Sequence, residues 1–245
     1  MTPRITLAVA RRVLTQLRRD RRTLALLLVM PCALMALLAW VFDDAPGHTF
    51  DHIAPQLLAL FPFTVMFLVT SVTTLRERTS GTLERLLAMP MGRVDLLLGY
   101  ALAFGLVACV QAGLAVLLSV FGLGLDIGGS LWMLGLIAVV DAVLGTALGL
   151  FVSAFARTEF QAVQFMPALV IPQVLVCGLF IPRDHLPRAL ELVSDVLPLS
   201  YAVDAMTEVA RGDSSASMMG DLGIVTLFAL ALLGCGALTL RRRTP

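Results

Sequence analysis

The sequence contains no lysine, since all 18 of its basic residues are arginine. A nucleotide-binding P-loop needs the lysine of the string G-x-x-x-x-G-K-[ST], and a Schiff-base enzyme needs a lysine amine. Both kinds of site are therefore excluded. Charged residues of either sign are also scarce, at 14% of the chain, where a soluble domain carries about a quarter. Such a chain is unsuited to an entirely aqueous surface.

Cysteine and histidine are also few, with four and three residues. No two cysteines form C-x-x-C, and each falls in an apolar run, so we interpret them as small apolar fillers. His48 and His52 have the i, i+4 spacing of zinc ligands, but Pro46 and Gly47 favour a loop there. No nucleophile–base arrangement is visible. We expect no catalytic residue, no metal site and no cofactor in this chain, and hence a protein that is not itself an enzyme.

Long apolar runs are what the sequence has instead. A transmembrane helix needs about 20 mostly apolar residues, and backbone groups in lipid must be satisfied within the segment. We therefore predict an all-α polytopic membrane protein, a single domain over residues 1–245. The six predicted spans are Thr23–Phe42, Ile53–Leu75, Leu96–Val120, Leu131–Phe155, Val163–Ile181 and Asp221–Leu240.

The arginines gather on alternate connectors between these runs. Fifteen of the 18 lie in residues 1–22, in residues 76–93, at Arg157 or at Arg241–Arg243. The other connectors carry Asp43, Asp44, Asp51, Asp126 and most of the acidic residues of 183–221. The positive-inside rule then predicts that both termini lie in the cytoplasm. An even number of spans agrees with this.

The leader, residues 1–22, is amphipathic at about 100° per residue. Residues such as Ile5, Val9 and Val13 fill one arc, and all its arginines except Arg21 fill the other. We expect an interface helix with its arginines toward lipid phosphates. It serves either as a generic topogenic anchor or also as a contact for a cytoplasmic partner.

Residues 76–93 form the one sizeable cytoplasmic loop. Ser80 and Gly81 interrupt the preceding helix, Thr82 is a suitable N-cap, and Pro90 disfavours helix at the residue before it. The pattern predicts a short amphipathic helix over Thr82–Met89. The charged residues of this loop can form hydrogen bonds with a partner, or they can simply belong to a solvated loop. The residues in question are Arg76, Glu77, Arg78, Thr82, Glu84 and Arg85.

Residues 183–213 contain two apolar-periodic pieces, Pro187–Leu197 and Ser200–Arg211, with Pro198 between them. Each is too short to span a bilayer. We predict an extracytoplasmic, re-entrant-like broken hairpin, peripheral to the bundle. Gly212 is typical of a helix stop.

Asp141 is the only ionisable residue deep inside a predicted span, and such a residue is a functional hypothesis by default. Gln111 and Gln173 lie at similar depths, roughly 12–15 Å from the outer ends at 1.5 Å per residue. We expect the three to meet in one polar cluster. Asp141 then either forms a structural hydrogen bond while protonated or takes part in a substrate contact or a proton-linked step.

Pro167 and Pro172 indicate a bent fifth span. Adaptable side chains near it can line an apolar path at a dimer interface, although they are equally typical of lipid-facing positions. These residues are Met30, Met35, Phe165, Met166 and Phe180.

Strings from three parts of the chain together resemble a known family. They are RERTSGTLERLLAMPMGR after the second span, F-M-P and G-L-F-I-P at 165–167 and 178–182, and L-P-L-S-Y-A-V-D-A at 197–205. In combination they resemble type-2 ABC exporter membrane subunits. The nearest likeness is to actinobacterial drug-resistance permeases of the daunorubicin-resistance kind, which export anthracycline-like compounds.

The resemblance implies a six-helix permease in the plasma (inner) membrane. By this resemblance the permease pairs with a second copy, or a sister permease, and with ATP-binding cassette subunits that bind ATP and magnesium. It further implies that residues 1–22 are an interface helix, that Thr82–Met89 is the coupling helix, and that a hydrophobic or amphiphilic compound is exported. A different class stays open, namely an ATP-independent carrier or an assembly scaffold that uses Asp141.

Overall fold

A computed structural model of the chain describes residues 3–43, 49–82, 92–213 and 216–239. Within these ranges the secondary structure is helical, without strands, and six helices are long and apolar enough to cross a membrane. The prediction of an all-α protein with six spans is thus confirmed. The six are α2 (Arg21–Val41), α3 (Thr49–Thr79), α5 (Arg93–Leu117) extended by the π-helix η1 (Leu118–Gly122), α6 (Leu131–Val152), α7 (Glu159–Val176) and α10 (Ala216–Thr239).

Local capping sets where two of these helices begin. Asp20 accepts hydrogen bonds from the Thr23 backbone N–H (3.1 Å) and hydroxyl (2.7 Å), and these bonds lower the pKa of Asp20. Thr158 Oγ1 accepts from the Gln161 N–H (3.2 Å), while Gln161 Oε1 accepts from the Arg157 N–H (2.9 Å). This reciprocal pair is a variant of the capping box. It starts α7 four residues before the predicted span.

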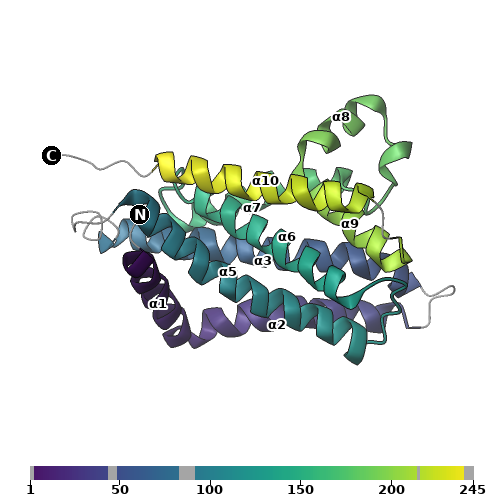
Figure 1. Ribbon diagram of the computed structural model, residues 1–245, viewed down its shortest axis with the longest axis horizontal. Coiled ribbons are helices and arrows are strands. Elements are labelled where there is room, and N and C mark those ends of the chain that lie inside the picture. Colours follow the sequence, from purple (N-terminus) through teal and green to yellow (C-terminus); the bar gives the residue numbers. More distant parts are fainter. Residues whose placement is uncertain (1–2, 44–48, 83–91, 214–215, 240–245) are drawn as a thin grey trace.

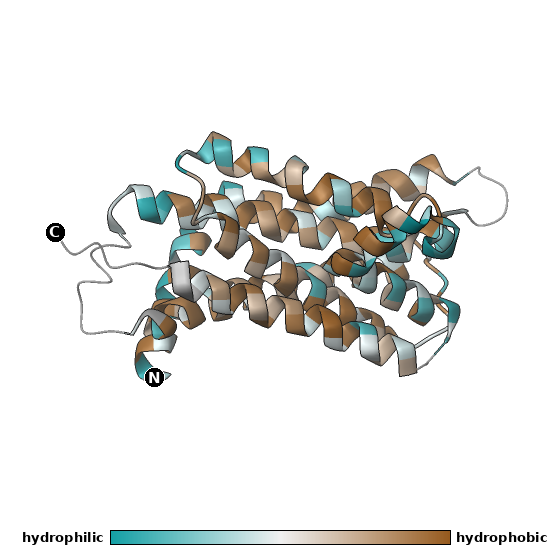
Figure 2. Ribbon diagram, turned by 90° about the horizontal axis from the view of Figure 1, so that it is seen from above, coloured by the Kyte–Doolittle hydropathy of each residue, from teal (hydrophilic) through white to brown (hydrophobic). Residues whose placement is uncertain are grey.

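The bundle has two distinct ends (Figure 1). The α1 end, as we call it, collects α1 (Pro3–Arg19), the C-terminal ends of α3, α6 and α10, and the first turns of α5 and α7. The opposite α9 end holds η2 (Arg183–His185), α8 (Arg188–Val196) and α9 (Pro198–Arg211). Figure 2 shows hydrophobic residues along the middle of the bundle and hydrophilic residues toward both ends, the pattern of a membrane protein.

Helix α6 lies at the centre and packs against α3, α5, α9 and α10. Two glycines let α3 approach it closely. A Cβ on Gly145 would lie 2.3 Å from the Phe63 carbonyl oxygen, and one on Gly149 would lie 2.5 Å from the Phe67 carbonyl oxygen. Small residues are typical of such contacts between membrane helices, because backbone proximity increases dispersion attraction. The spacing of these glycines thus fixes the separation of α3 and α6.

The break near Pro198 is confirmed, with Pro198 itself as the first residue of α9. Gly212 ends α9 with φ +84°, in the left-handed region that glycine adopts without strain. Of the two pieces, α9 packs against the bundle. Its Leu199, Ala202 and Met206 are fully buried against the bundle. Only α8 stands apart, as Figure 1 shows. The apolar face of α9 is long enough to join the core although it is too short to span.

Gly149→Ala should destabilise the bundle by about 1–3 kcal/mol, because the added methyl group meets backbone atoms that cannot rotate away. Gly135→Ala is the matched control: it lies in the same helix and nothing is within 4 Å of its Cβ position. The measurement is the thermal unfolding midpoint in detergent, followed by the loss of the monodisperse elution peak. Equal midpoints for the two variants would contradict the proposed close contact.

Candidate functional site at the α1 end

The carboxylate of Glu77, near the end of α3, joins three helices. Glu77 is 3% exposed and forms an ion pair with Arg12 of α1, with 3.5 Å between Nη1 and Oε2. The hydroxyl of Tyr100, from α5, donates a hydrogen bond to the same carboxylate oxygen. Hydrogen bonds to a charged group are the stronger kind. We call Arg12, Glu77 and Tyr100 the α1 node.

Helix α1 also packs directly on the first turns of α5. A Cβ on Gly99 would lie 2.6 Å from Val9 Cβ, and the Thr6 hydroxyl donates to Asp95 Oδ1 at 3.5 Å. Val9, Val13 and Leu17 are each at most 5% exposed. Part of the apolar arc of this helix is therefore covered by protein.

A second charged pair at this end joins α3 to the first turn of α7. The Arg76 guanidinium donates to both oxygens of Glu159, at 2.7 and 2.9 Å. Both side chains are about half exposed. An exposed pair adds little stability, but the two-pronged geometry fixes the relative position of its partners. The α3 terminus is thus tied to α1 and α5 on one side and to α7 on the other.

The structure describes only some of the predicted coupling residues, and these differ in burial and in hydrogen bonding. Glu84 and Arg85 lie outside the described residues, as does all of 83–91, so the predicted coupling helix is described only at Thr82. The hydroxyl oxygens of Ser80 and Thr82 are 3.0 Å apart. Arg78 is partly buried, and its Nε has no hydrogen-bond partner among the described residues.

For Glu77 the prediction of a partner-facing charge is wrong, because its carboxylate faces into the bundle. Arg76 is likewise occupied, by Glu159. Sequence reasoning missed Tyr100, one of only two tyrosines in the chain. A tyrosine inside an apolar run needs a polar partner when it is buried. This requirement is the signal in the sequence that could have indicated a carboxylate at the same depth.

The three polar residues expected within the membrane are buried, and no hydrogen bond joins them among the described residues. Gln111 donates to the Leu27 carbonyl oxygen at 3.0 Å, and Gln173 donates to that of Leu169 at 3.1 Å. Asp141 is fully buried, and neither carboxylate oxygen has a hydrogen-bond partner among the described residues. Each glutamine instead donates to a nearby backbone carbonyl, as buried polar groups generally find a hydrogen-bond partner.

The predicted apolar path is also not continuous. Met35 is fully buried in the core, whereas Met30, five residues earlier on α2, is 44% exposed. Phe165 and Met166 are partly buried against the core. Only Phe180, at 66% exposed, lines a large pocket at the α9 end, of about 890 Å³. The two methionines therefore do not share one exposed face, because five residues turn a helix by about 140°.

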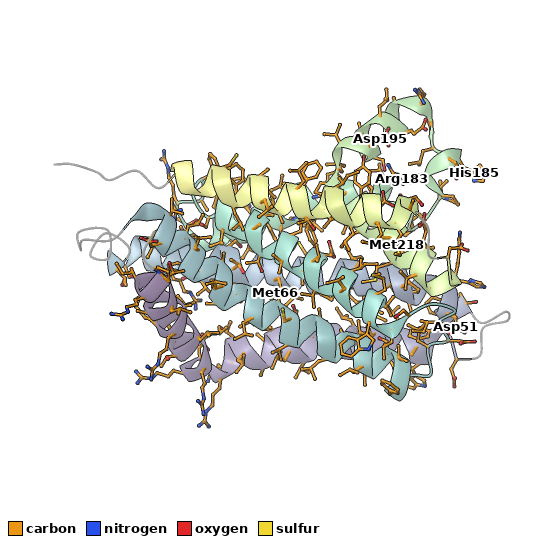
Figure 3. The ribbon with its side chains drawn as sticks, viewed as in Figure 1. Asp51, Met66, Arg183, His185, Asp195 and Met218 are labelled. Atoms are coloured by element: carbon orange, nitrogen blue, oxygen red, sulfur yellow. The ribbon has the colours of Figure 1, made fainter. Side chains whose placement is uncertain are left out.

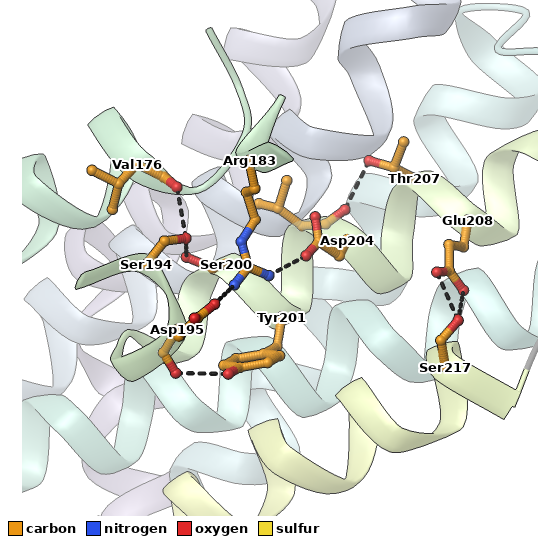
Figure 4. Close-up of polar contacts among 11 residues, drawn as sticks. Val176, Arg183, Ser194, Asp195, Ser200, Tyr201, Asp204, Thr207, Glu208 and Ser217 are labelled. Atoms are coloured by element: carbon orange, nitrogen blue, oxygen red, sulfur yellow. Dashed lines mark hydrogen bonds and ion pairs between the residues drawn. The ribbon is translucent and has the colours of Figure 1, made fainter. Parts of the chain in front are cut away.

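The α9 end is held by an arginine cluster that the sequence did not reveal (Figure 4). Arg183 pairs with Asp195 at 2.6 Å and with Asp204, and its guanidinium carbon lies 5.2 Å from the centre of the Tyr201 ring. Ser194 donates to the Val176 carbonyl oxygen at 2.8 Å. Burial raises the pKa of Asp204, an effect that Arg183 opposes. This cluster ties α8 to α9 and to the end of α7.

Comparison with known proteins identifies the family. The model of the ABC-2 type transporter family matches residues 4–210. The chain belongs to this family. The linearmycin resistance permease protein LnrN of Bacillus subtilis is 27% identical over 186 residues, covering 73% of this chain and 48% of that protein. The probable multidrug ABC transporter permease YbhR of Escherichia coli is 25% identical over 191 residues, covering 78% and 52%.

A eukaryotic relative, ABC transporter G family member 20 of Dictyostelium discoideum, is 27% identical over 169 residues, which cover 69% of this chain and 23% of that protein. The chain therefore spans about half the length of the two bacterial relatives and about a quarter of the length of the Dictyostelium protein. Six spanning helices and the family together make it a multi-pass membrane protein.

Glu77→Ala should destabilise the α1 end by about 2 kcal/mol, because it leaves Arg12 and the Tyr100 hydroxyl without their shared acceptor. Arg76→Gln, which breaks the exposed pair with Glu159, should cost less than about 1 kcal/mol. Limited proteolysis at the arginines of α1 measures release of that helix. If the two variants are cleaved equally fast, the α1 node does not hold α1.

Proposed function

We propose that this chain is the membrane permease subunit of an ATP-driven exporter. It pairs with a second permease and with separate ATP-binding cassette subunits, and it moves a hydrophobic or amphiphilic compound out of the cell. Catalysis of ATP hydrolysis, with its magnesium, belongs to the partner, since this sequence has no P-loop lysine.

One observation carries this proposal. The segment that links α3 to α5 leaves and enters the bundle at the α1 end, where two ion pairs and the Tyr100–Glu77 hydrogen bond join α1, α3, α5 and α7. A force applied to that connector would pass into four helices at once, because the Glu77 and Arg76 side chains lie in the last turns of α3. A permease that is driven by a separate ATPase subunit needs such a connection between its helices. Membership of the ABC-2 type transporter family supports it.

Sidedness and cargo follow from different observations. The arginine-rich α1 end is the cytoplasmic end by the positive-inside rule, and α8 and α9 then lie at the extracytoplasmic end of the bundle. Helix α7 exposes Phe160, Ile171 and Leu175, a surface suited to a second permease or to lipid. Two relatives carry "multidrug" or "linearmycin resistance" in their names, and an apolar cargo is consistent with them.

Charge reversal in the connector tests the coupling. Glu84→Arg should abolish co-purification with the partner ATPase and its stimulated hydrolysis, since opposite charge at a docking contact costs several kcal/mol. Asp184→Arg is the control, because Asp184 is 77% exposed at the opposite end. Retained docking and hydrolysis in Glu84→Arg would refute the role of this connector.

Sidedness is tested by labelling in intact cells with a membrane-impermeant maleimide. Asp184→Cys should react from outside, while Thr79→Cys, at the exposed end of α3, should react only after permeabilisation. The native cysteines lie within helices or at the end of α7, and wild-type protein gives their background. Labelling of Thr79→Cys in intact cells would reverse the proposed orientation.

The alternative, an ATP-independent carrier, depends on Asp141 because its two carboxylate oxygens are buried without a described partner. Asn has nearly the same shape but cannot carry a proton. If the side chain is structural, Asp141→Asn should assemble and transport like the wild type, measured as cargo efflux in cells with the partner ATPase. Loss of transport with normal assembly would favour the carrier or a direct cargo contact.

A further inference from the structure

The outward face of α1 carries two exposed arginines beside one exposed leucine and one partly buried leucine. Leu7, Arg11, Leu14 and Arg18 are spaced by four, three and four residues, which places them in one stripe. Arg11 and Arg18 are exposed, and Leu7 is 63% exposed although it is apolar. Figure 3 shows nitrogen-tipped side chains extending away from the bundle around α1 and the start of α2. The α1 node uses none of these four residues.

Two grooves run along α1, with Arg11 in the wall of both. The smaller, of about 310 Å³, has an apolar floor and a cationic rim; its lining is Leu7, Ala10, Arg11, Leu14, Thr15 and Arg18. The larger, of about 630 Å³, is lined mostly by residues with polar side chains; its lining is Ala8, Arg11, Arg12, Thr15, Gln16 and Arg19. Neither lining contains a carboxylate, so the guanidinium groups favour an anion.

The chemistry of the two grooves fits one amphiphile. Guanidinium groups bind phosphate through paired N–H donors, and Arg11 lies in the lining of both grooves. The Leu7 and Leu14 side chains offer an apolar strip about one helical turn from each arginine. A ligand with a phosphate and an apolar chain would satisfy both, whereas a free phosphate would leave Leu7 exposed.

Depth decides between a lipid and a protein surface. Helix α1 ends at Arg19, and the membrane-spanning α2 begins at Arg21. Only one residue separates them, so α1 lies beside the end of the hydrocarbon layer, where phospholipid headgroups are. Its other face is already covered by α5. The remaining face is therefore at headgroup level with exposed leucine.

We propose that this face binds an anionic glycerophospholipid. Arg11 and Arg18 hold its phosphate, the larger groove takes the polar headgroup near Arg19, and the first part of one acyl chain lies along Leu7 and Leu14. The lipid thereby covers the apolar stripe and neutralises the arginines on its rim. Its binding requires no partner ATPase, so this proposal and the coupling proposal can fail separately.

The test uses the full-length chain in neutral detergent micelles with fluorescent phosphatidylglycerol as the probe, followed by anisotropy. The double variant Arg11→Gln/Arg18→Gln should raise Kd about 30-fold, since each arginine beside an anionic lipid contributes about fivefold. Arg157→Gln removes an exposed arginine at the same end of the bundle and should change Kd less than twofold. Arg11→Lys/Arg18→Lys should fall between, because it keeps the charge and loses the paired donors.

Four results would overturn the proposal. Equal Kd for phosphatidylcholine and phosphatidylglycerol would mean that charge is not recognised. An equal effect of Arg157→Gln would mean diffuse attraction rather than a site. Displacement of the probe by glycerol phosphate at the same concentration as by unlabelled phosphatidylglycerol would indicate a free-phosphate site. A double variant that binds the lipid normally but loses the partner ATPase would assign the face to that protein.

Discussion

The buried carboxylate of Glu77 is the interaction on which the α1 end depends. A charge taken out of water is costly unless it is paired and hydrogen-bonded. Arg12 and Tyr100 supply that pairing from two other helices. Separating α1, α3 and α5 would therefore leave the Glu77 charge without its partners. The exposed Arg76–Glu159 pair fixes the position of α7 relative to α3 but adds little stability. One buried pair and one exposed pair thus hold four helices at the level where the chain leaves the membrane.

Much of the fold could be predicted because lipid imposes a simple rule. Apolar runs of sufficient length must be helices, so the six spans were evident from Thr23 to Leu240. The positions of Pro198 and Gly212 also set the ends of α9 correctly. Boundaries were missed where a side chain decides them: the Thr158–Gln161 pair begins α7 earlier than hydropathy indicates.

The candidate site was harder to predict, because direction matters more there than spacing. Glu77 lies in the motif that carried the family resemblance, yet its side chain faces inward, which depends on Tyr100 being 23 residues away and at the same depth. Depth alone also misled the prediction for Asp141, Gln111 and Gln173. Each of the two glutamines found a backbone carbonyl on its own or a neighbouring helix, and a linear sequence does not record such local choices.

The central position of α6 has a mechanical consequence. In an apolar stretch of 18 residues, 61% of the residues of α6 are buried, against 17% in α2 and 22% in α7. Displacing α6 would break contacts with four helices and the glycine-mediated contact with α3 together, whereas α2 and α7 have little to lose on their outer sides. Helix α6 is therefore the helix whose displacement would cost most, whereas α2 and α7 could shift with less loss of internal packing.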